Sequence, residues 1–308
     1  MTRREWFRLV SGAALAAVFR SRARSASLSW SEAARPESPL ERHYRADAQV
    51  LILSIPLLHR AGVGGGRVSW RETTDADGGA LRLLEFVGFS DPKRAAGLNR
   101  LGFVKELVRL SANRLDEALY FGLMTSSPEE SAEDARKALH STASEVVYSA
   151  IEGRAAVGDA ATRRVHFTAS SKLSASQWSE LETLARQALA GSNPRTPEFD
   201  PRSACPATFL ETMAEMLHRR TEEGRYVYDG RIYRLSLHRA PDAKSTAYFR
   251  ERGMTSGVVI RVNGRLRREA GGREFDFRLW VEEGAARPLP LRIEYQAKSY
   301  LRLTFEAA

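Results

Sequence analysis

The chain closes with REFDFRLWVEEGAARPLPLRIEYQAKSYLRLTFEAA, residues 273–308, in which apolar and charged residues alternate. A period of two is the spacing of side chains along a β-strand, where neighbouring residues point to opposite faces. We therefore predict strands with one apolar face, and with a solvated face whose Arg and Glu pairs each contribute about 0.2–1 kcal/mol. The apolar set is Phe275, Phe277, Leu279, Val281, Leu291, Ile293 and Tyr295, and the alternating set is Glu274, Asp276, Arg278, Trp280, Arg292 and Glu294.

Turn residues extend this pattern toward the N-terminus. Asp229-Gly230 and Asn263-Gly264 each lie between extended runs, and such pairs favour the two-residue turn of a β-hairpin. We also predict turns at GVGGG (62–66), at DADGG (75–79), at 111–113 and around Gly158-Asp159. Helices are predicted around residues 127–140, 174–190 and 206–220 from capping residues and helical periodicity. The fold class is mainly β (α+β), antiparallel, with about three helices.

The bulk composition suits a soluble globular protein. The chain has 308 residues, 43% of them hydrophobic, and a net charge of +9. Six arginines against Glu5 place +5 of this in residues 1–27, which leaves +4 for the remainder. That residual charge argues against a nucleic-acid partner. Because Cys205 is the single cysteine, no intramolecular disulfide can form.

The N-terminus has the layout of an export signal. Arg3 and Arg4 precede an apolar run from Leu9 to Phe19, and small residues follow. The sequence from Thr2 to Arg8, TRREWFR, resembles the twin-arginine export motif of bacteria. A basic amphipathic surface helix is the alternative. We predict an export signal at 1–27, a Ser/Pro-rich linker at 28–41 and a single β-rich domain at 42–308. Three arginines after the apolar run leave open whether the signal is cleaved.

A family resemblance covers the last third of the chain. From residue 200 onward the order FDPRS, a helix, GRYVYDGRIYRLSL, a Gly-containing turn, FDFRLWV and PLPLRIEY is similar to a widespread family of exported bacterial proteins of unknown function. The resemblance implies a long antiparallel sheet curled into an open barrel, with a plan like that of the periplasmic lipoprotein carriers. It implies a periplasmic or otherwise exported location, and it carries over no catalytic residue.

The sequence signals for catalytic groups are weak. Cys205 precedes a predicted helix, but His218 lies too far along that helix to act as its base. Ser90-Asp91-Pro92-Lys93 matches the S-x-x-K of penicillin-recognising enzymes without the partner motifs. Asp75 and Asp77 lack the other ligands of a calcium loop, and the histidines lack zinc-site spacing. We therefore assign no catalytic residue, metal or cofactor, and we lean against an enzyme.

The function that remains is binding or carrying an apolar, lipid-like ligand on the concave face of a curled sheet in the bacterial envelope. The predicted lining residues are Tyr226, Tyr228, Phe275, Phe277 and Tyr295. One alternative is a structural or assembly protein that pairs a sheet edge with an envelope partner. The other is an envelope hydrolase that uses Cys205 or Ser90, for which single-site covalent labelling would be the discriminating observation.

Overall fold

Fifteen strands and two helices make up the part of the chain that the computed structural model describes. Residues 1–39, which include Arg3, Arg4 and the predicted export signal, lie outside it, and β1 begins at Leu40. The described residues are 40–52, 55–74, 80–91, 93–95, 99–111, 114–127, 142–143, 145–154, 162–170, 173–174, 207–228, 231–272 and 274–308.

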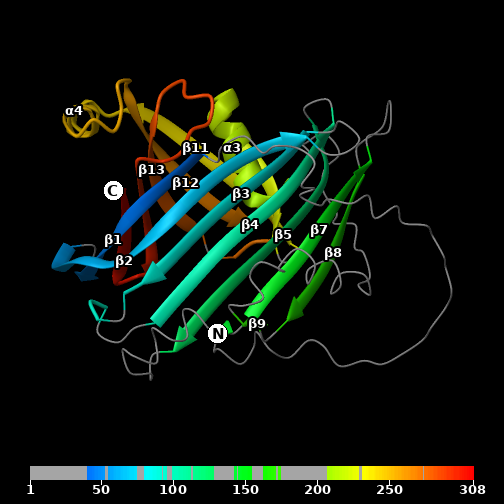
Figure 1. Ribbon diagram of the computed structural model, residues 1–308, viewed down its shortest axis with the longest axis horizontal. Helices are drawn as coiled ribbons and strands as arrows, with labels where there is room; N and C mark the ends of the chain where they lie inside the picture. The colour runs from blue at the N-terminus through cyan, green and yellow to red at the C-terminus, as the bar shows by residue number, and fades with distance from the viewer. Residues whose placement is uncertain are drawn as a thin grey trace.

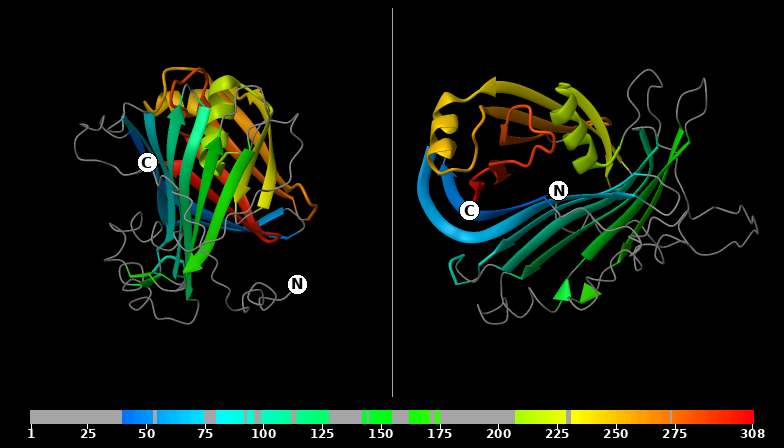
Figure 2. Two further views of the ribbon diagram at one scale, coloured as in Figure 1. Left: turned by 90° about the vertical axis from the view of Figure 1, so that its right-hand side faces the viewer. Right: turned by 45° about the horizontal axis from the view of Figure 1, so that its top comes forward.

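Thirteen strands form one antiparallel sheet that curls on itself without closing (Figure 1, Figure 2). In sheet order they are β10 (Glu223–Tyr228), β11 (Arg231–Pro241), β12 (Val259–Arg268), β13 (Phe275–Glu282), β14 (Arg292–Lys298), β15 (Leu301–Ala307), β1 (Leu40–Ile52), β2 (Ile55–Thr74), β3 (Ala80–Ser90), β4 (Asn99–Ser111), β5 (Arg114–Ser127), β7 (Glu145–Arg154) and β8 (Thr162–Ser170). Two short strands, β6 (Thr142–Ala143) and β9 (Leu173–Ser174), pair separately. The prediction of a mainly antiparallel, curled and open sheet is confirmed.

The two halves of the chain meet where β15 pairs with β1, with Phe305 opposite Ala46. Helix α3 (Phe209–Arg219) lies across the concave side and contacts β10, β3 and β4 (Figure 1). It therefore bridges strands that the open sheet does not join. Beyond the strands that α3 bridges, β5, β7 and β8 extend the sheet outward (Figure 2).

Strand β2 runs straight through GVGGG, so the turn predicted there is wrong. Ala46 of β1 pairs with Gly64 of β2, but Ala48 pairs with Arg60, so β2 carries extra residues that form a bulge. Within this bulge, Gly62 adopts a left-handed φ of 63°. The Gly62 amide donates to Asp47 Oδ1 at 2.7 Å. At Gly66, a Cβ atom would lie 2.8 Å from the Val87 carbonyl oxygen, so this position requires glycine because of close packing rather than a turn.

The turn predicted at Asn263-Gly264 is also wrong, because both residues lie in the middle of β12. Gly264 pairs with Phe277, and a Cβ atom on Gly264 would lie 2.0 Å from Cζ of that ring. The glycine leaves room for an aromatic side chain of the neighbouring strand. The Asp229-Gly230 prediction fares better, because Tyr228 pairs with Arg231 across two residues that themselves lie outside the described part.

In the other predicted hairpins, the strands on either side of the turn pair with each other. Ser111 pairs with Arg114 at the end of β4 and β5, and Arg154 pairs with Thr162 at the end of β7 and β8. Thr74 pairs with Ala80 on either side of DADGG. The residues of that loop, including Asp75 and Asp77, lie outside the described part.

Two helices are described where about three were predicted. Helix α3 confirms the helix predicted near 206–220, whereas the predictions at 127–140 and 174–190 lie outside the described residues. Helix α4 (Ala243–Glu251) was not predicted. It is short and weakly patterned, and it begins at Asp242, whose carboxylate accepts a hydrogen bond from the Ser245 amide at 2.9 Å.

The closing stretch alternates as predicted, except that Trp280 and Leu291 both pack in the cluster around Phe249 of α4. Arg278 lies 3.4 Å from Glu294 on the outer face, and Leu279 and Val281 are buried on the inner face. Trp280 shares the outer face but is only 5% exposed, because Phe249 of α4 packs against it. Its indole also donates to Asp242 Oδ2 at 2.9 Å. The solvated face therefore ends where α4 covers the sheet.

Candidate functional site: an apolar cavity beneath helix α3

A cavity of about 340 Å³ lies between α3 and the concave face of the sheet. Its lining is apolar apart from Ser69, Glu85, Asp276 and Gln296. The sheet contributes Val68, Trp70, Leu84, Phe86, Val104, Leu266, Phe275, Phe277, Leu279, Ile293 and Tyr295; α3 contributes Phe209, Leu210, Met213, Ala214 and Leu217; and the β13–β14 loop contributes Pro288, Leu289 and Pro290. An apolar pocket of this size is within the range of small-molecule sites.

Helix α3 forms one wall because its apolar residues recur at helical spacing. Phe209, Met213 and Leu217 follow one another every four residues and line the cavity. The adjoining face of the helix packs on β10, where a Cβ atom on Gly224 would lie 2.4 Å from Sδ of Met216. Glycine at this position therefore allows the helix to approach the strand closely.

The N-terminus of α3 is capped by a side chain from a distant strand. Glu106 of β4 is 1% exposed and accepts hydrogen bonds from the Leu210 amide at 2.8 Å and the Glu211 amide at 3.0 Å. Thr208 occupies the N-cap position and makes no side-chain capping bond. The carboxylate thus satisfies amides that a helix leaves unpaired, at the positive end of its dipole.

A second attachment is ionic. Arg82 of β3 donates to Glu211 Oε1 at 2.8 Å and to Glu72 Oε1 at 2.9 Å, and its guanidinium lies 4.7 Å from the centre of the Trp70 ring. Arg287, which lies in the β13–β14 loop, donates to Glu72 Oε2 at 3.0 Å. These contacts join α3, the sheet and the loop beside Trp70 of the cavity wall.

Burial raises the pKa of two of the three carboxyls in this cluster. It raises the pKa of Glu106 to about 7, and it raises the pKa of Glu211 although Arg82 opposes the shift. For Glu72, burial is outweighed by hydrogen bonds and by Arg82, so the pKa is lowered. Glu106 is therefore a carboxyl whose charge changes near neutral pH.

Three of the five predicted lining residues reach the cavity. Phe275, Phe277 and Tyr295 line it, with Phe275 48% exposed and Tyr295 36% exposed at its rim. Tyr226 is buried behind the wall, with its ring centre 5.1 Å from that of Phe209. Tyr228 is half-buried and packs against the same cluster behind the wall.

The residues of the hydrolase alternative give no catalytic arrangement. Cys205 lies outside the described residues. Ser90 ends β3 opposite Gly64, and the Lys93 amide donates to Asp91 Oδ1 at 3.0 Å in the turn that follows. Within the described ranges, no group of three or more His, Cys, Asp or Glu residues could hold a metal ion. Nor does any helix there have the length and apolar character needed to cross a membrane.

The residues that reasoning from sequence missed are the ones that hold α3 in place. Glu106 shares a strand face with Val104 and Val108, and a carboxylate on an otherwise apolar face was a signal that could have been noticed. Arg82 and Glu211 are 129 residues apart, and no sequence spacing connects them.

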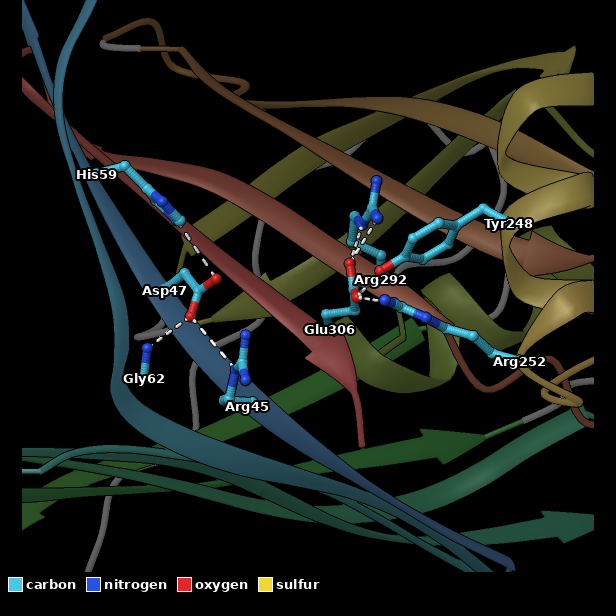
Figure 3. Close-up of polar contacts among 8 residues, drawn as sticks. All are labelled: Arg45, Asp47, His59, Gly62, Tyr248, Arg252, Arg292 and Glu306. Carbon is cyan, nitrogen blue, oxygen red and sulfur yellow. Dashed lines mark hydrogen bonds and ion pairs between the residues drawn. The ribbon is translucent and has the colours of Figure 1, made fainter.

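Two further polar clusters lie away from the cavity lining (Figure 3). Asp47 accepts from the Gly62 amide, and His59 Nε2 lies 3.4 Å from its other oxygen. Glu306 accepts hydrogen bonds from Arg292 Nε at 2.9 Å, from Arg252, the C-cap residue of α4, at 3.0 Å, and from the Tyr248 hydroxyl of α4. The first cluster stabilises the β2 bulge and the second attaches α4, so both are interpreted as structural.

Comparisons with known proteins give a structural likeness. No family model matches the chain, and the curated proteins contain no match to it. Among solved structures, it is similar to the crystal structure of a β-barrel-like protein of domain of unknown function DUF1849 from Brucella abortus. The TM-score is 0.49 at 9% sequence identity, over 88% of this chain and 95% of the other.

Proposed function

We propose that this protein binds or carries an apolar, lipid-like molecule in the cavity beneath α3, within the bacterial envelope. The observation that carries the proposal is the composition of the cavity wall, in which nineteen of the 23 lining residues are apolar or aromatic. Water in such a space finds few hydrogen-bond partners, so an apolar chain that displaces it gains free energy.

The rim supports the same ligand class. Phe275 and Tyr295 are exposed at the cavity mouth, where an entering apolar molecule would contact them first. Large side chains exposed in this way are a cost for a soluble protein unless a ligand or partner covers them. The envelope location rests on the resemblance of residues 2–8 to the twin-arginine motif, and signal cleavage is part of what must be measured.

Filling the cavity tests the proposal. Ala214 is 7% exposed and lines the space, whereas Ala247 is exposed on α4, away from the cavity lining. We expect Ala214→Phe to weaken binding of the fluorescent fatty acid cis-parinaric acid by at least about tenfold, or about 1.4 kcal/mol. Ala247→Phe makes the same change in size on a helix and should leave binding unchanged.

Native mass spectrometry of the protein from its export compartment gives an independent readout. Extra mass that is lost on denaturation would reveal a bound molecule and begin to identify it. A bare polypeptide mass, together with equal parinaric acid binding by the Ala214→Phe and wild-type proteins, would overturn the proposal.

A second candidate is assembly with an envelope protein through a sheet edge. Among the described strands, β8 pairs with β7 alone, so its other edge has no described partner. Edge strands of this kind accept an added strand from another chain. A photo-crosslinker placed at Phe167 in β8, but not one at Ala247, should then recover a single envelope partner.

A further inference from the structure

Three apolar side chains are exposed at one end of the curled sheet. Leu57 is 63% exposed, Leu58 59% and Tyr300 57%. The first two lie in β2 near the β1–β2 connection, and Tyr300 lies between β14 and β15. The Leu51 amide donates to the Tyr300 carbonyl at 2.8 Å, which holds the two connections side by side.

The cavity lining extends toward the same end. Tyr295 and Gln296 lie near the C-terminal end of β14, directly before the connection that bears Tyr300, and Phe277 pairs with Tyr295 across the sheet. The exposed rim of the cavity and the exposed apolar residues are therefore on one side of the molecule.

An apolar track joins them on the concave face. Residues paired across an antiparallel sheet share a face, as do residues two apart along a strand. Tyr295 pairs with Leu303, Leu301 pairs with Val50, and Val50 pairs with Leu58. The track therefore leads without a change of face from the cavity lining to Leu58.

The charge at this end is positive. Arg60 and Arg302 lie in residues 48–60 and 296–303, which contain no Asp or Glu, and the neighbouring Asp47 lies 3.4 Å from His59 and 3.6 Å from Arg45. Arg60 is exposed. Basic residues next to exposed apolar ones match the surface of a bilayer that contains anionic lipids, where headgroups attract the cations and the acyl boundary accepts the apolar side chains.

We propose that this end docks on an anionic lipid bilayer, with Leu57, Leu58 and Tyr300 inserted at the headgroup boundary and the concave track open to the acyl chains. The docking proposal rests only on the exposure of these three side chains and on the positive charge at this end. Passage of a lipid chain along the track into the cavity rests on the proposed function.

Vesicle flotation tests the docking. The full protein is mixed with vesicles of phosphatidylcholine alone or with added phosphatidylglycerol, at low and high salt. We expect binding to the phosphatidylglycerol vesicles that weakens as salt screens the charges. The triple variant Leu57→Ser, Leu58→Ser, Tyr300→Ser should bind at least about tenfold more weakly, since it removes the apolar contacts. Val258, which is 46% exposed elsewhere, provides the control Val258→Ser, with wild-type binding expected.

The outcomes separate docking from ligand binding. The triple variant should still bind cis-parinaric acid in solution, because its three positions lie outside the cavity lining. Vesicle binding without any parinaric acid binding would support docking and overturn the proposed function. Absence of vesicle binding, or equal binding by the triple variant, would overturn docking. Concentration-dependent dimerisation without vesicles, lost in the triple variant, would also overturn it and assign this end to a second copy of the chain.

Discussion

Gly264 lies opposite Phe277 in the register of β12 and β13, and the aromatic ring occupies the space that a Cβ atom would need. We expect Gly264→Ala to destabilise the protein by about 1–3 kcal/mol, as overpacked interior positions do. Urea unfolding measures the change in the free energy of unfolding.

A second substitution identifies the cause. If the clash with the ring is responsible, Gly264→Ala combined with Phe277→Leu should cost less than the sum of the two single changes. A turn glycine would show no such coupling, because its cost would come from its own backbone angles. Additive costs would therefore contradict the packing explanation.

At the scale of elements, α3 depends on Glu106 for the capping of its first turn. The pKa of Glu106 is about 7 in the folded protein, against an ordinary value of 4.5. Between these values the folded protein holds a proton that the unfolded chain releases. The stability that this proton contributes is fully present below about pH 4.5 and is lost as pH rises through about 7, with a total on the order of 3 kcal/mol.

The prediction is therefore a stability that falls between about pH 4.5 and about pH 7, with a smaller fall in Glu106→Gln. The Gln side-chain amide cannot ionise, so the variant lacks the proton that Glu106 releases in the wild-type protein. Glu211, whose pKa is also raised, should preserve part of the slope. Glu274→Gln removes the same formal charge at an exposed position and serves as the control. An unchanged slope in Glu106→Gln would refute this role.

At the scale of the whole molecule, β15 joins the two halves of the sheet. It lies between β14 and β1, and Phe305 packs with Tyr44 and Ala46, more than 250 residues away in sequence. A chain that ends at Tyr300 would lack this strand and expose the edges of both neighbours. We expect it to show no cooperative unfolding transition by circular dichroism.

The matched variant Phe305→Ala keeps the strand and removes the ring. It should retain a cooperative transition while losing about 3–5 kcal/mol of stability, as large-to-small core substitutions do. If the truncated chain unfolded cooperatively near the wild-type midpoint, β15 would not be the joint that this topology indicates.

Local pattern accounts for much of the fold. Alternation predicted the strands of residues 274–308, and the pairing of Tyr228 with Arg231 and of Ser111 with Arg114 agrees with the predicted hairpins. The errors arose where a neighbouring strand altered the meaning of a residue. Gly264 serves the ring of Phe277, and Trp280 is covered by α4. Neither neighbour is visible in the local sequence.

The sequence by itself determined that the closing stretch is extended and that alternate residues form an apolar face, because side-chain direction in a strand depends only on a period of two. Of the five aromatic residues predicted from it to line a ligand site, three lie on the cavity wall and two lie behind it. Only the tertiary structure decided that a cavity exists, since its walls come from α3, from six strands (β2, β3, β4, β12, β13 and β14) and from the β13–β14 loop. The tertiary structure alone placed Glu106 at α3, because α3 packs against β3 and β4 as well as β10. It alone placed Leu58 on the same face as Tyr295, because this arrangement depends on the pairing of β15 with β1.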